Sequence, residues 1–151
     1  MKPQFSIILH PASWIRYFLT LLLILPLTTH PSILLTSGPD EAIKQITKGI
    51  QEGDAIKVSN HFSTMVDLIL PGYNDTYAKK QAGQILKEFF YQNPVKSFRV
   101  TKQGSSENGS HYAIGELQSG GKTYRVYFLL QASGGQNLIQ QLKIEESNSG
   151  S

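Results

Sequence analysis

The hydrophobic period of the chain changes at Asn93-Pro94, and this change restricts the fold more than any other feature of the sequence. After Pro94, apolar residues tend to alternate with polar ones in four segments: 95–103, 111–118, 123–131 and 138–145. The turn residues between these segments are Asn108-Gly109, 119–121 and Gly134-Gly135. Alternation of period two predicts β-strands, and short glycine turns join strands as hairpins. The second half of the chain is therefore expected to be an antiparallel meander.

Before Pro94 the apolar residues follow a helical period. A first helix is indicated by isoleucines that share one face, Ile43, Ile46 and Ile50. Ser37 or Asp40 can cap the first turn of this helix, because both side chains carry oxygens that accept from free backbone N–H groups. Gly53 ends the helix, and Asp54 can cap a short second helix whose apolar face includes Phe62.

A strand pair and a third helix come next. Segment 66–70 is apolar and ends at the turn dipeptide Pro71-Gly72, and 73–77 can return as a short strand. The third helix runs to about Tyr91, and its apolar stripe comprises Ala78, Ala82, Ile85 and Phe89. The expected fold class is an α+β roll in which three N-terminal helices pack on one face of a curved antiparallel sheet.

The N-terminus has the pattern of an export signal. Lys2 and Arg16 precede an apolar run at 17–27, which has the length of a signal-peptide core, whereas about 20 apolar residues are needed to span a bilayer. We expect 1–38 to be a signal peptide with a short linker, cleaved between Thr28 and Gly38. The alternative is an uncleaved anchor. The domain then covers 39–146, 147–151 is a disordered tail, and the protein is secreted or periplasmic without a stable membrane anchor.

Composition excludes several kinds of chemistry. The chain has no cysteine, so disulfides, thiolate zinc sites, iron–sulfur clusters and a cysteine nucleophile are excluded. The 14 Lys and Arg residues include Lys2 and Arg16, so from Pro39 onward basic residues outnumber the 11 acidic ones by only one. These charges are interspersed along the chain. A nucleic-acid partner is not expected, because a phosphate-binding surface needs clustered cations.

Short motifs spread over about half of the domain resemble those of one family. They are Pro71-Gly72, Gln81-Ala82, 84–86, Phe89-Phe90, Asn93-Pro94, Ser97-Phe98, Gln103-Gly104, 112–115, 124–126, 138–142 and Ile144-Glu145. These residues resemble the bacterial family catalogued as domain of unknown function 4783, a group of small exported proteins. The resemblance implies export and a nuclear transport factor 2-like (cystatin-like) cone fold, and it implies no activity. Lys102 stands where the resemblance implies a histidine, so no role of that histidine is carried over.

The cone fold implies a cavity between the curved sheet and the helices, where related folds hold their ligands. In steroid-isomerase relatives a strand carboxylate removes a proton there, and a tyrosine helps to stabilise the oxyanion. Asp67 is the one carboxylate near the position that the resemblance implies. The first helix has no tyrosine, and Tyr112, Tyr124 or Tyr127 could substitute. Alternation within an apolar strand nevertheless favours an Asp67 that faces solvent.

One cation and two histidines are the remaining candidates for chemistry. Arg125 lies in an apolar strand next to Tyr124, and a buried arginine needs a partner. A cross-strand ion pair with Glu116 is the first interpretation, and capture of an anionic ligand is the second. His61 and His111 lack the spacing of metal ligands, so we expect surface or capping roles for them, no metal and no cofactor.

Three functions remain open. The leading one is a non-catalytic exported module that binds a small molecule or a protein on the concave sheet face, with Arg125, Tyr112, Tyr127 and Tyr124 as ligand-binding residues. The first alternative is a cavity enzyme of the isomerase, dehydratase or hydrolase type that uses Asp67 with tyrosines. The second is a structural homodimer, because segment 123–131 is apolar on both faces and one of them needs cover.

Overall fold

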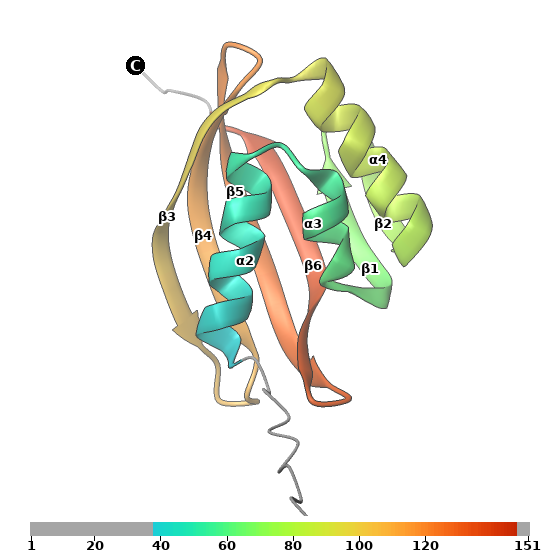
Figure 1. Cartoon of the computed structure of the whole chain (residues 1–151), viewed down its shortest axis with the longest axis vertical. Coiled ribbons are helices and arrows are strands. Elements are labelled where there is room, and N and C mark those ends of the chain that lie inside the picture. Colours follow the sequence, from blue (N-terminus) through green and yellow to red (C-terminus); the bar gives the residue numbers. More distant parts are fainter. Residues whose placement is uncertain (1–37, 148–151) are drawn as a thin grey trace, which may run out of the picture. The chain divides into compact units, whose positions relative to one another are not determined.

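The computed structural model describes residues 38–147, which form three helices and six strands (Figure 1). The predicted export segment up to Ser37 and the predicted tail from residue 148 onward lie outside the described residues. Within 38–147, no helix is long and apolar enough to cross a membrane. The helices and strands, in chain order, are α2 (Pro39–Gln51), α3 (Ala55–Asn60), β1 (Phe62–Leu70), β2 (Tyr73–Ala78), α4 (Lys79–Gln92), β3 (Val95–Ser105), β4 (His111–Ser119), β5 (Lys122–Ser133) and β6 (Gln136–Glu146).

The expected order of two helices, a strand pair, a helix and four strands is confirmed. The expected fold class, with three N-terminal helices on an antiparallel sheet, is less exact than this order in one detail and wrong in another. Only α2 and α3 precede the first strand, whereas α4 lies between β2 and β3. The sheet also has one parallel pair, because β1 lies beside β6 in the order β2-β1-β6-β5-β4-β3. A parallel neighbour requires a long crossover, and here the chain from β2 to β5 supplies it.

The helix starts illustrate how local sequence acts. Pro39 opens α2, where a missing N–H costs nothing. The N-cap residue is Gly38, and Asp40 lies inside the first turn, so the expected cap by Asp40 is wrong and Ser37 lies outside the described residues. The cap of α3 is confirmed, because Asp54 accepts from the backbone N–H groups of Ile56 and Lys57, each at 3.0 Å.

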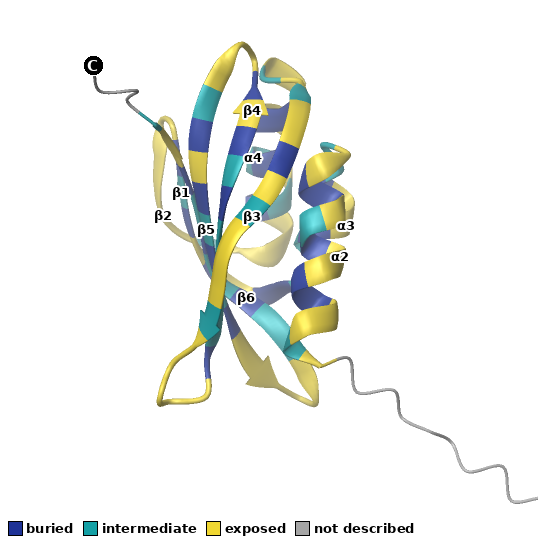
Figure 2. Cartoon of the chain, turned by 90° about the vertical axis from the view of Figure 1, so that its left-hand side faces the viewer, coloured by how far each residue is buried: buried dark blue, intermediate teal, exposed yellow. Residues whose placement is uncertain are grey.

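All three helices cover the same face of the sheet, and the sheet curves around them (Figure 2). The core lies between these two layers. Alternate residues of the strands point into it, and those with 0% exposure are Leu68, Ala113, Leu117, Val126, Phe128, Leu130, Ile139, Leu142 and Ile144. The helices contribute further fully buried side chains, Ile46, Ile50, Val58, Ala82 and Leu86. The concave face is therefore covered by helices, and its central side chains are closed to solvent.

Phe62 departs from the expectation. It was expected on the apolar face of the second helix, but it is the first residue of β1, pairs with Ile139 of β6 and is 1% exposed. The register of β1 against β6 shifts between Phe62 and Asp67. This irregularity separates the start of the strand from the regular alternation at 66–70, which explains why period alone indicates the shorter strand.

Candidate functional site

The sheet has a second face, turned away from the helices, and we call it the outer face. In Figure 2 no helix lies on this side of the strands. On β5 the buried residues Tyr124, Val126, Phe128 and Leu130 take the helix side. Successive side chains of a strand point to opposite faces. Arg125, Tyr127 and Leu129 therefore lie on the outer face.

A small apolar cluster occupies the middle of the outer face. It comprises Tyr112 and Ile114 of β4 with Tyr127 and Leu129 of β5, and we call these four residues the outer strip. Ile114 is opposite Tyr127 in the strand register, and Tyr112 is opposite Leu129. The rings of Tyr112 and Tyr127 stack with centroids 6.4 Å apart and planes 26° apart. All four side chains are half-buried, so they keep apolar surface in contact with water.

Gly104 makes room for this arrangement. It lies opposite Tyr112 in the β3–β4 register, and a Cβ atom built on it would lie 2.8 Å from the Tyr112 hydroxyl and 3.0 Å from the ring carbon that carries it. A larger residue at position 104 would push the tyrosine ring away. The glycine in Gln103-Gly104 thus positions an aromatic side chain of the outer strip.

A row of alternating charges borders the outer strip. Arg99 of β3 is opposite Glu116 of β4, Glu116 is opposite Arg125 of β5, and Arg125 is opposite Glu145 of β6. We call these four residues the charge row. The sign of the charge alternates from one strand to the next across the four strands. A polar rim of both signs beside an apolar centre is the usual anatomy of a protein interface.

Arg125 does not have the environment that was expected. It is exposed, and it forms no ion pair with any residue of 38–147. Glu116 instead pairs with Arg99, at 3.6 Å between Nη2 and Oε1. The expected ion pair between Arg125 and Glu116 is therefore wrong, because Arg99 on the other side of Glu116 takes the carboxylate and water solvates Arg125. Among the described residues, the Arg125 guanidinium has no ion-pair partner, and it lies beside the outer strip.

Two shallow hollows adjoin Arg125 on the outer face. One has a volume of about 380 Å³ and is lined by Arg125, Tyr127, Gln141, Lys143 and Glu145. The other has a volume of about 330 Å³ and is lined by 101–102, 114–116, Arg125 and Ser147. The concave face carries neither of them. Arg125 belongs to both hollows, which makes it the central polar group of this surface.

The expected ligand-binding residues do not share one face. Arg125, Tyr112 and Tyr127 lie on the outer face, so their expected position on the concave face is wrong. Tyr124 is on the helix side and is 3% exposed. Its ring meets Phe89 edge to face at 5.5 Å, and its hydroxyl donates to Asn93 Oδ1 at 3.4 Å. Tyr124 is thus a core residue of this structure.

Asp67 likewise lies outside the concave face. It is exposed on β1, and the hydroxyl of Thr76, its cross-strand partner on β2, donates to its carboxylate at 2.6 Å. Its neighbours Val66 and Leu68 are the ones that enter the core. The alternative that Asp67 acts as a base inside the cavity is therefore wrong, because the alternation of β1 turns this carboxylate to solvent.

The two described histidines lie apart. His61 is the C-cap residue of α3, and His111 begins β4. Burial of His61, together with the positive charge of nearby Lys79, lowers the pKa of its imidazole below the ordinary value of 6.5. Across residues 38–147, no three His, Cys, Asp or Glu side chains gather closely enough to hold a metal ion.

The sequence contained a signal that would have separated these residues. Tyr124 and Arg125 are consecutive in one strand, so they cannot point to the same face. The sequence did not predict the stacking of Tyr112 on Tyr127 in the same way, because the stacking depends on the register between β4 and β5.

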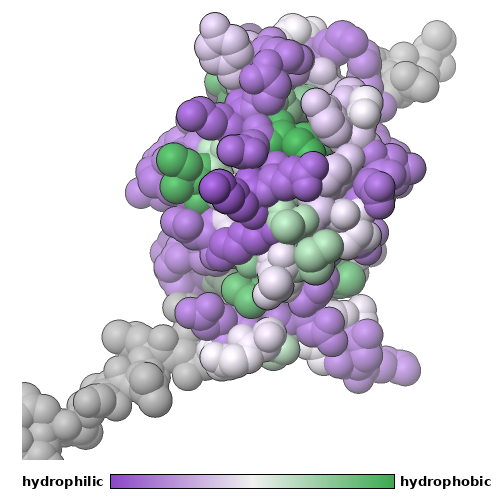
Figure 3. Space-filling view, turned by 90° about the vertical axis from the view of Figure 1, so that its right-hand side faces the viewer, coloured by the Kyte–Doolittle hydropathy of each residue, from purple (hydrophilic) through white to green (hydrophobic). Residues whose placement is uncertain are grey.

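The surface of the domain on the side of α4 and β2 is mainly hydrophilic (Figure 3), as expected for elements that bury only one face.

Comparison with known proteins agrees with this architecture. Two crystal structures of DUF4783 family proteins match the chain. One is from Bacteroides uniformis, with TM-score 0.66 and 24% identity, and the match covers 70% of this chain and 97% of that one. The other is from Bacteroides ovatus, with TM-score 0.65 and 28% identity, and the match covers 70% of this chain and 94% of that one. A protein of unknown function from Cytophaga hutchinsonii, described as NTF2-like, matches with TM-score 0.52, 11% identity and coverage of 72% and 88%. The fold is therefore NTF2-like. No curated protein matches the sequence.

A family model fits most of the described domain. The model described as "Domain of unknown function (DUF4783)" matches residues 43–145, from within α2 to the end of β6. The matched range includes the outer strip, the charge row and Gly104. The chain belongs to the DUF4783 family.

Proposed function

We propose that this protein is an exported, non-catalytic binding module whose binding surface is the outer face, and that the outer face binds a second copy of the same chain. The observation that carries this proposal is the charge row beside the outer strip. Export is part of the proposal through the N-terminal apolar run. The concave face is left to the core, because the helices already cover it.

The outer strip supplies the apolar contact that an interface needs. An antiparallel sheet can leave one face in water, and that face then carries mainly polar residues. Here the outward residues of β4 and β5 include two tyrosines, an isoleucine and a leucine in one cluster. Tyrosine is enriched in protein interfaces because it offers a large area together with a polar tip. Covering this cluster with a partner protein removes the apolar area from water.

The charge row favours a second copy as that partner. The row reads positive, negative, positive, negative from Arg99 to Glu145. A two-fold axis that runs along the strands between β4 and β5 reverses this order in the second copy. Arg125 then faces Glu116 of the second copy, and Ile114 faces Tyr127 of the second copy. A two-fold interface must be complementary to itself, and the centre of the outer face meets that condition.

A charge-swap experiment tests the proposal. Protein recovered after expression of the full-length gene is studied by sedimentation equilibrium, and we expect a monomer–dimer equilibrium. Arg125→Glu or Glu116→Arg alone should weaken the dimer by about tenfold or more, because each places like charges at the interface. The double variant, Arg125→Glu with Glu116→Arg, should restore dimerisation, because opposite charges face each other again.

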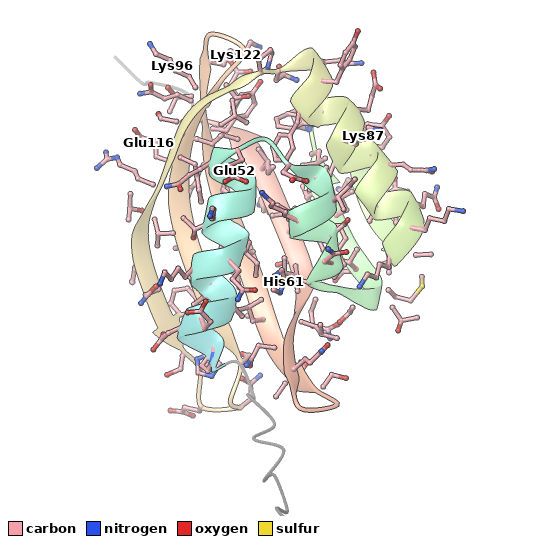
Figure 4. The ribbon with its side chains drawn as sticks, viewed as in Figure 1. Glu52, His61, Lys87, Lys96, Glu116 and Lys122 are labelled. Atoms are coloured by element: carbon pink, nitrogen blue, oxygen red, sulfur yellow. The ribbon has the colours of Figure 1, made fainter. Side chains whose placement is uncertain are left out.

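Two controls make the result specific. Lys87→Glu changes the charge equally on the exposed side of α4 (Figure 4), and it should leave the equilibrium unchanged. Tyr127→Glu should weaken the dimer without a rescue by any charge swap. A protein that stays monomeric at millimolar concentration, or a double variant that dimerises as weakly as the single variants, would overturn the proposal.

Mass spectrometry of the recovered protein tests export, with an N-terminus expected between residues 28 and 38.

A further inference from the structure

Two positively charged side chains of the outer face have no partner within residues 38–147. They are Arg125 of β5 and Lys102 of β3, and neither side chain forms an ion pair or a hydrogen bond with these residues. Lys102 is opposite Ile114 in the strand register, and Ile114 belongs to the outer strip. Residues directly opposite each other on neighbouring strands point to the same face. Lys102 therefore shares the outer face with Arg125.

Both cations line the same hollow, one of the two that adjoin Arg125. Its volume is about 330 Å³, and we call it the cationic hollow. Arg125 borders it from β5 and Lys102 borders it from β3, while β4 between them supplies residues 114–116. Strands β3 and β5 are two strand spacings apart, which is about 10 Å. The cationic hollow therefore has a positive charge on each side, with the apolar side chain of Ile114 in between.

The cationic hollow keeps its positive charge although its wall includes a carboxylate. Glu116 is the acidic residue among those that line it, and Arg99, which is not a lining residue, pairs with Glu116 at 3.6 Å. Because Arg99 balances Glu116, no other group that lines the hollow balances Lys102 and Arg125. A hollow with two such cations attracts anions.

The surface around the hollow has the same sign. The strand register places four residues side by side in a row next to the charge row: Lys102, Ile114, Tyr127 and Lys143. The two rows together contain four cations and two carboxylates, an excess of two positive charges. From Pro39 onward the whole chain has an excess of only one. These two rows are therefore more positive than the rest of the domain, which favours an anionic ligand here.

We propose that the cationic hollow binds a small dicarboxylate, with one carboxylate on Arg125 and the other on Lys102. The planar guanidinium of arginine matches a carboxylate with two parallel hydrogen bonds, and the ammonium of lysine binds a second carboxylate as a point charge. Methylene groups between the two carboxylates can contact Ile114. Cations on two separate strands favour a ligand with two anionic ends over one compact anion.

The dicarboxylate and a second copy of the chain use the same guanidinium. This step rests on the proposed function, in which Arg125 faces Glu116 of the second copy. A carboxylate of the ligand on Arg125 excludes that contact, so the ligand should compete with the dimer. Lys102 has no such role, because the two-fold axis places it opposite Lys143 of the second copy, where like charges repel. Substitution of Lys102 therefore separates ligand binding from dimerisation.

The test is a titration followed by amide NMR shifts, on protein recovered after expression of the full-length gene. The probes are succinate, inorganic phosphate and the neutral analogue succinamide, each at an ionic strength held constant with sodium chloride, because salt screens exposed charges. We expect succinate to give saturable shifts at millimolar concentration, centred on the amides of 101–102, 114–116 and Arg125. Phosphate should bind more weakly than succinate, and succinamide should give no saturable shifts.

Matched variants locate the site. Lys102→Met keeps an unbranched side chain and removes the charge, and it should weaken succinate binding about threefold to fivefold, the usual effect of one exposed ion pair. Arg125→Gln should weaken it at least as much. Lys87→Met is the same substitution as Lys102→Met on the exposed side of α4 (Figure 4), and it should leave the affinity unchanged. Lys102 is exposed, so its substitution does not threaten the fold.

Sedimentation equilibrium tests the competition with the dimer. Succinate should weaken the wild-type dimer more than sodium chloride does at the same ionic strength, because succinate occupies Arg125. Lys102→Met should leave the dimer without succinate at least as stable as wild type, and succinate should then weaken that dimer less. A dimer that succinate does not weaken, although the amide shifts saturate, would contradict the competition.

Three results would overturn the dicarboxylate site. The first is that succinate produces no saturable shifts. The second is that Lys102→Met and Lys87→Met bind succinate equally well, which places the binding elsewhere. The third is that phosphate or succinamide binds as tightly as succinate. A protein that binds succinate and never dimerises would overturn the dimer alone, and a dimer without succinate shifts would overturn the site alone, so the two failures are distinguishable.

Discussion

The ring of Phe98 on β3 covers Gly115 on β4 so closely that a Cβ atom added to Gly115 would lie 2.4 Å from Cε2 of the ring. The same atom would lie 2.7 Å from the backbone oxygen of Arg99. Phe98 is 3% exposed, and its own carbonyl accepts from the Gln51 side chain of α2 at 2.9 Å. Phe98 therefore links the edge strand β3 both to α2, through its carbonyl, and to β4, through a ring that leaves no room for a Cβ atom at Gly115.

Gly115→Ala is expected to destabilise the protein by about 1–3 kcal/mol, the range for a methyl group forced into a packed site. Urea unfolding of this variant measures the loss. The exposed substitution Gln118→Ala on the same strand is the control and should stay within about 0.5 kcal/mol of wild type. Adding Phe98→Leu should recover part of the loss, because the smaller side chain yields space. Full stability of Gly115→Ala would refute the contact.

Asp54→Ala is expected to cost about 1 kcal/mol, the usual value of an N-cap side chain. The Lys57 backbone N–H that Asp54 caps holds the pKa of this carboxyl below its ordinary value of 3.8. A lowered folded pKa means that the stabilisation is complete above pH 3.8 and is lost as the pH falls further. Thermal unfolding from pH 7 to pH 2 measures it. Glu107→Ala, in the β3–β4 loop, is the control, and an equal pH profile of both variants would contradict the cap.

His61 should make the stability depend on pH in a higher pH range than Asp54 does. Burial and Lys79 hold its folded pKa below the ordinary value of 6.5, so the unfolded chain binds the proton more readily. Stability is therefore unaffected by this group above pH 6.5 and falls as the pH drops below that value. The fall between pH 7.5 and 5 should be smaller in His61→Phe than in wild type. Gln118→Leu, at an exposed position of β4, should keep the wild-type slope, and a shared slope in all three proteins would show that His61 is not the cause.

Local patterns predicted most of the secondary structure. The glycine turns are an example, because Gly120, Gly121, Gly134 and Gly135 all adopt positive φ, between 57° and 77°. Glycine adopts this conformation without steric cost, so its position in the sequence marks the hairpin. Gly53, with φ of 63°, ends α2 for the same reason. Such features depend on residues that are neighbours in the chain.

The candidate site was less accessible to sequence reasoning. β5 carries apolar residues on both faces, with Val126 and Phe128 on one and Tyr127 and Leu129 on the other. Period two separates these two sets, but it does not say which set the helices cover. The sequence also did not indicate the hollow of about 210 Å³ next to His61, since this hollow combines residues of α2, α3 and the β5–β6 hairpin. No spacing within one segment indicates such a site.

By itself the sequence determined the helices, the strands, the turns and the family resemblance, because backbone preferences and hydrophobic period act between residues close in the chain. The tertiary structure alone decided that β1 pairs with β6, that Arg125 and Tyr127 lie outside the core, and that His61 lines a pocket. These features depend on contacts between segments far apart in the chain. Such contacts exist only once the sheet has closed on its helices.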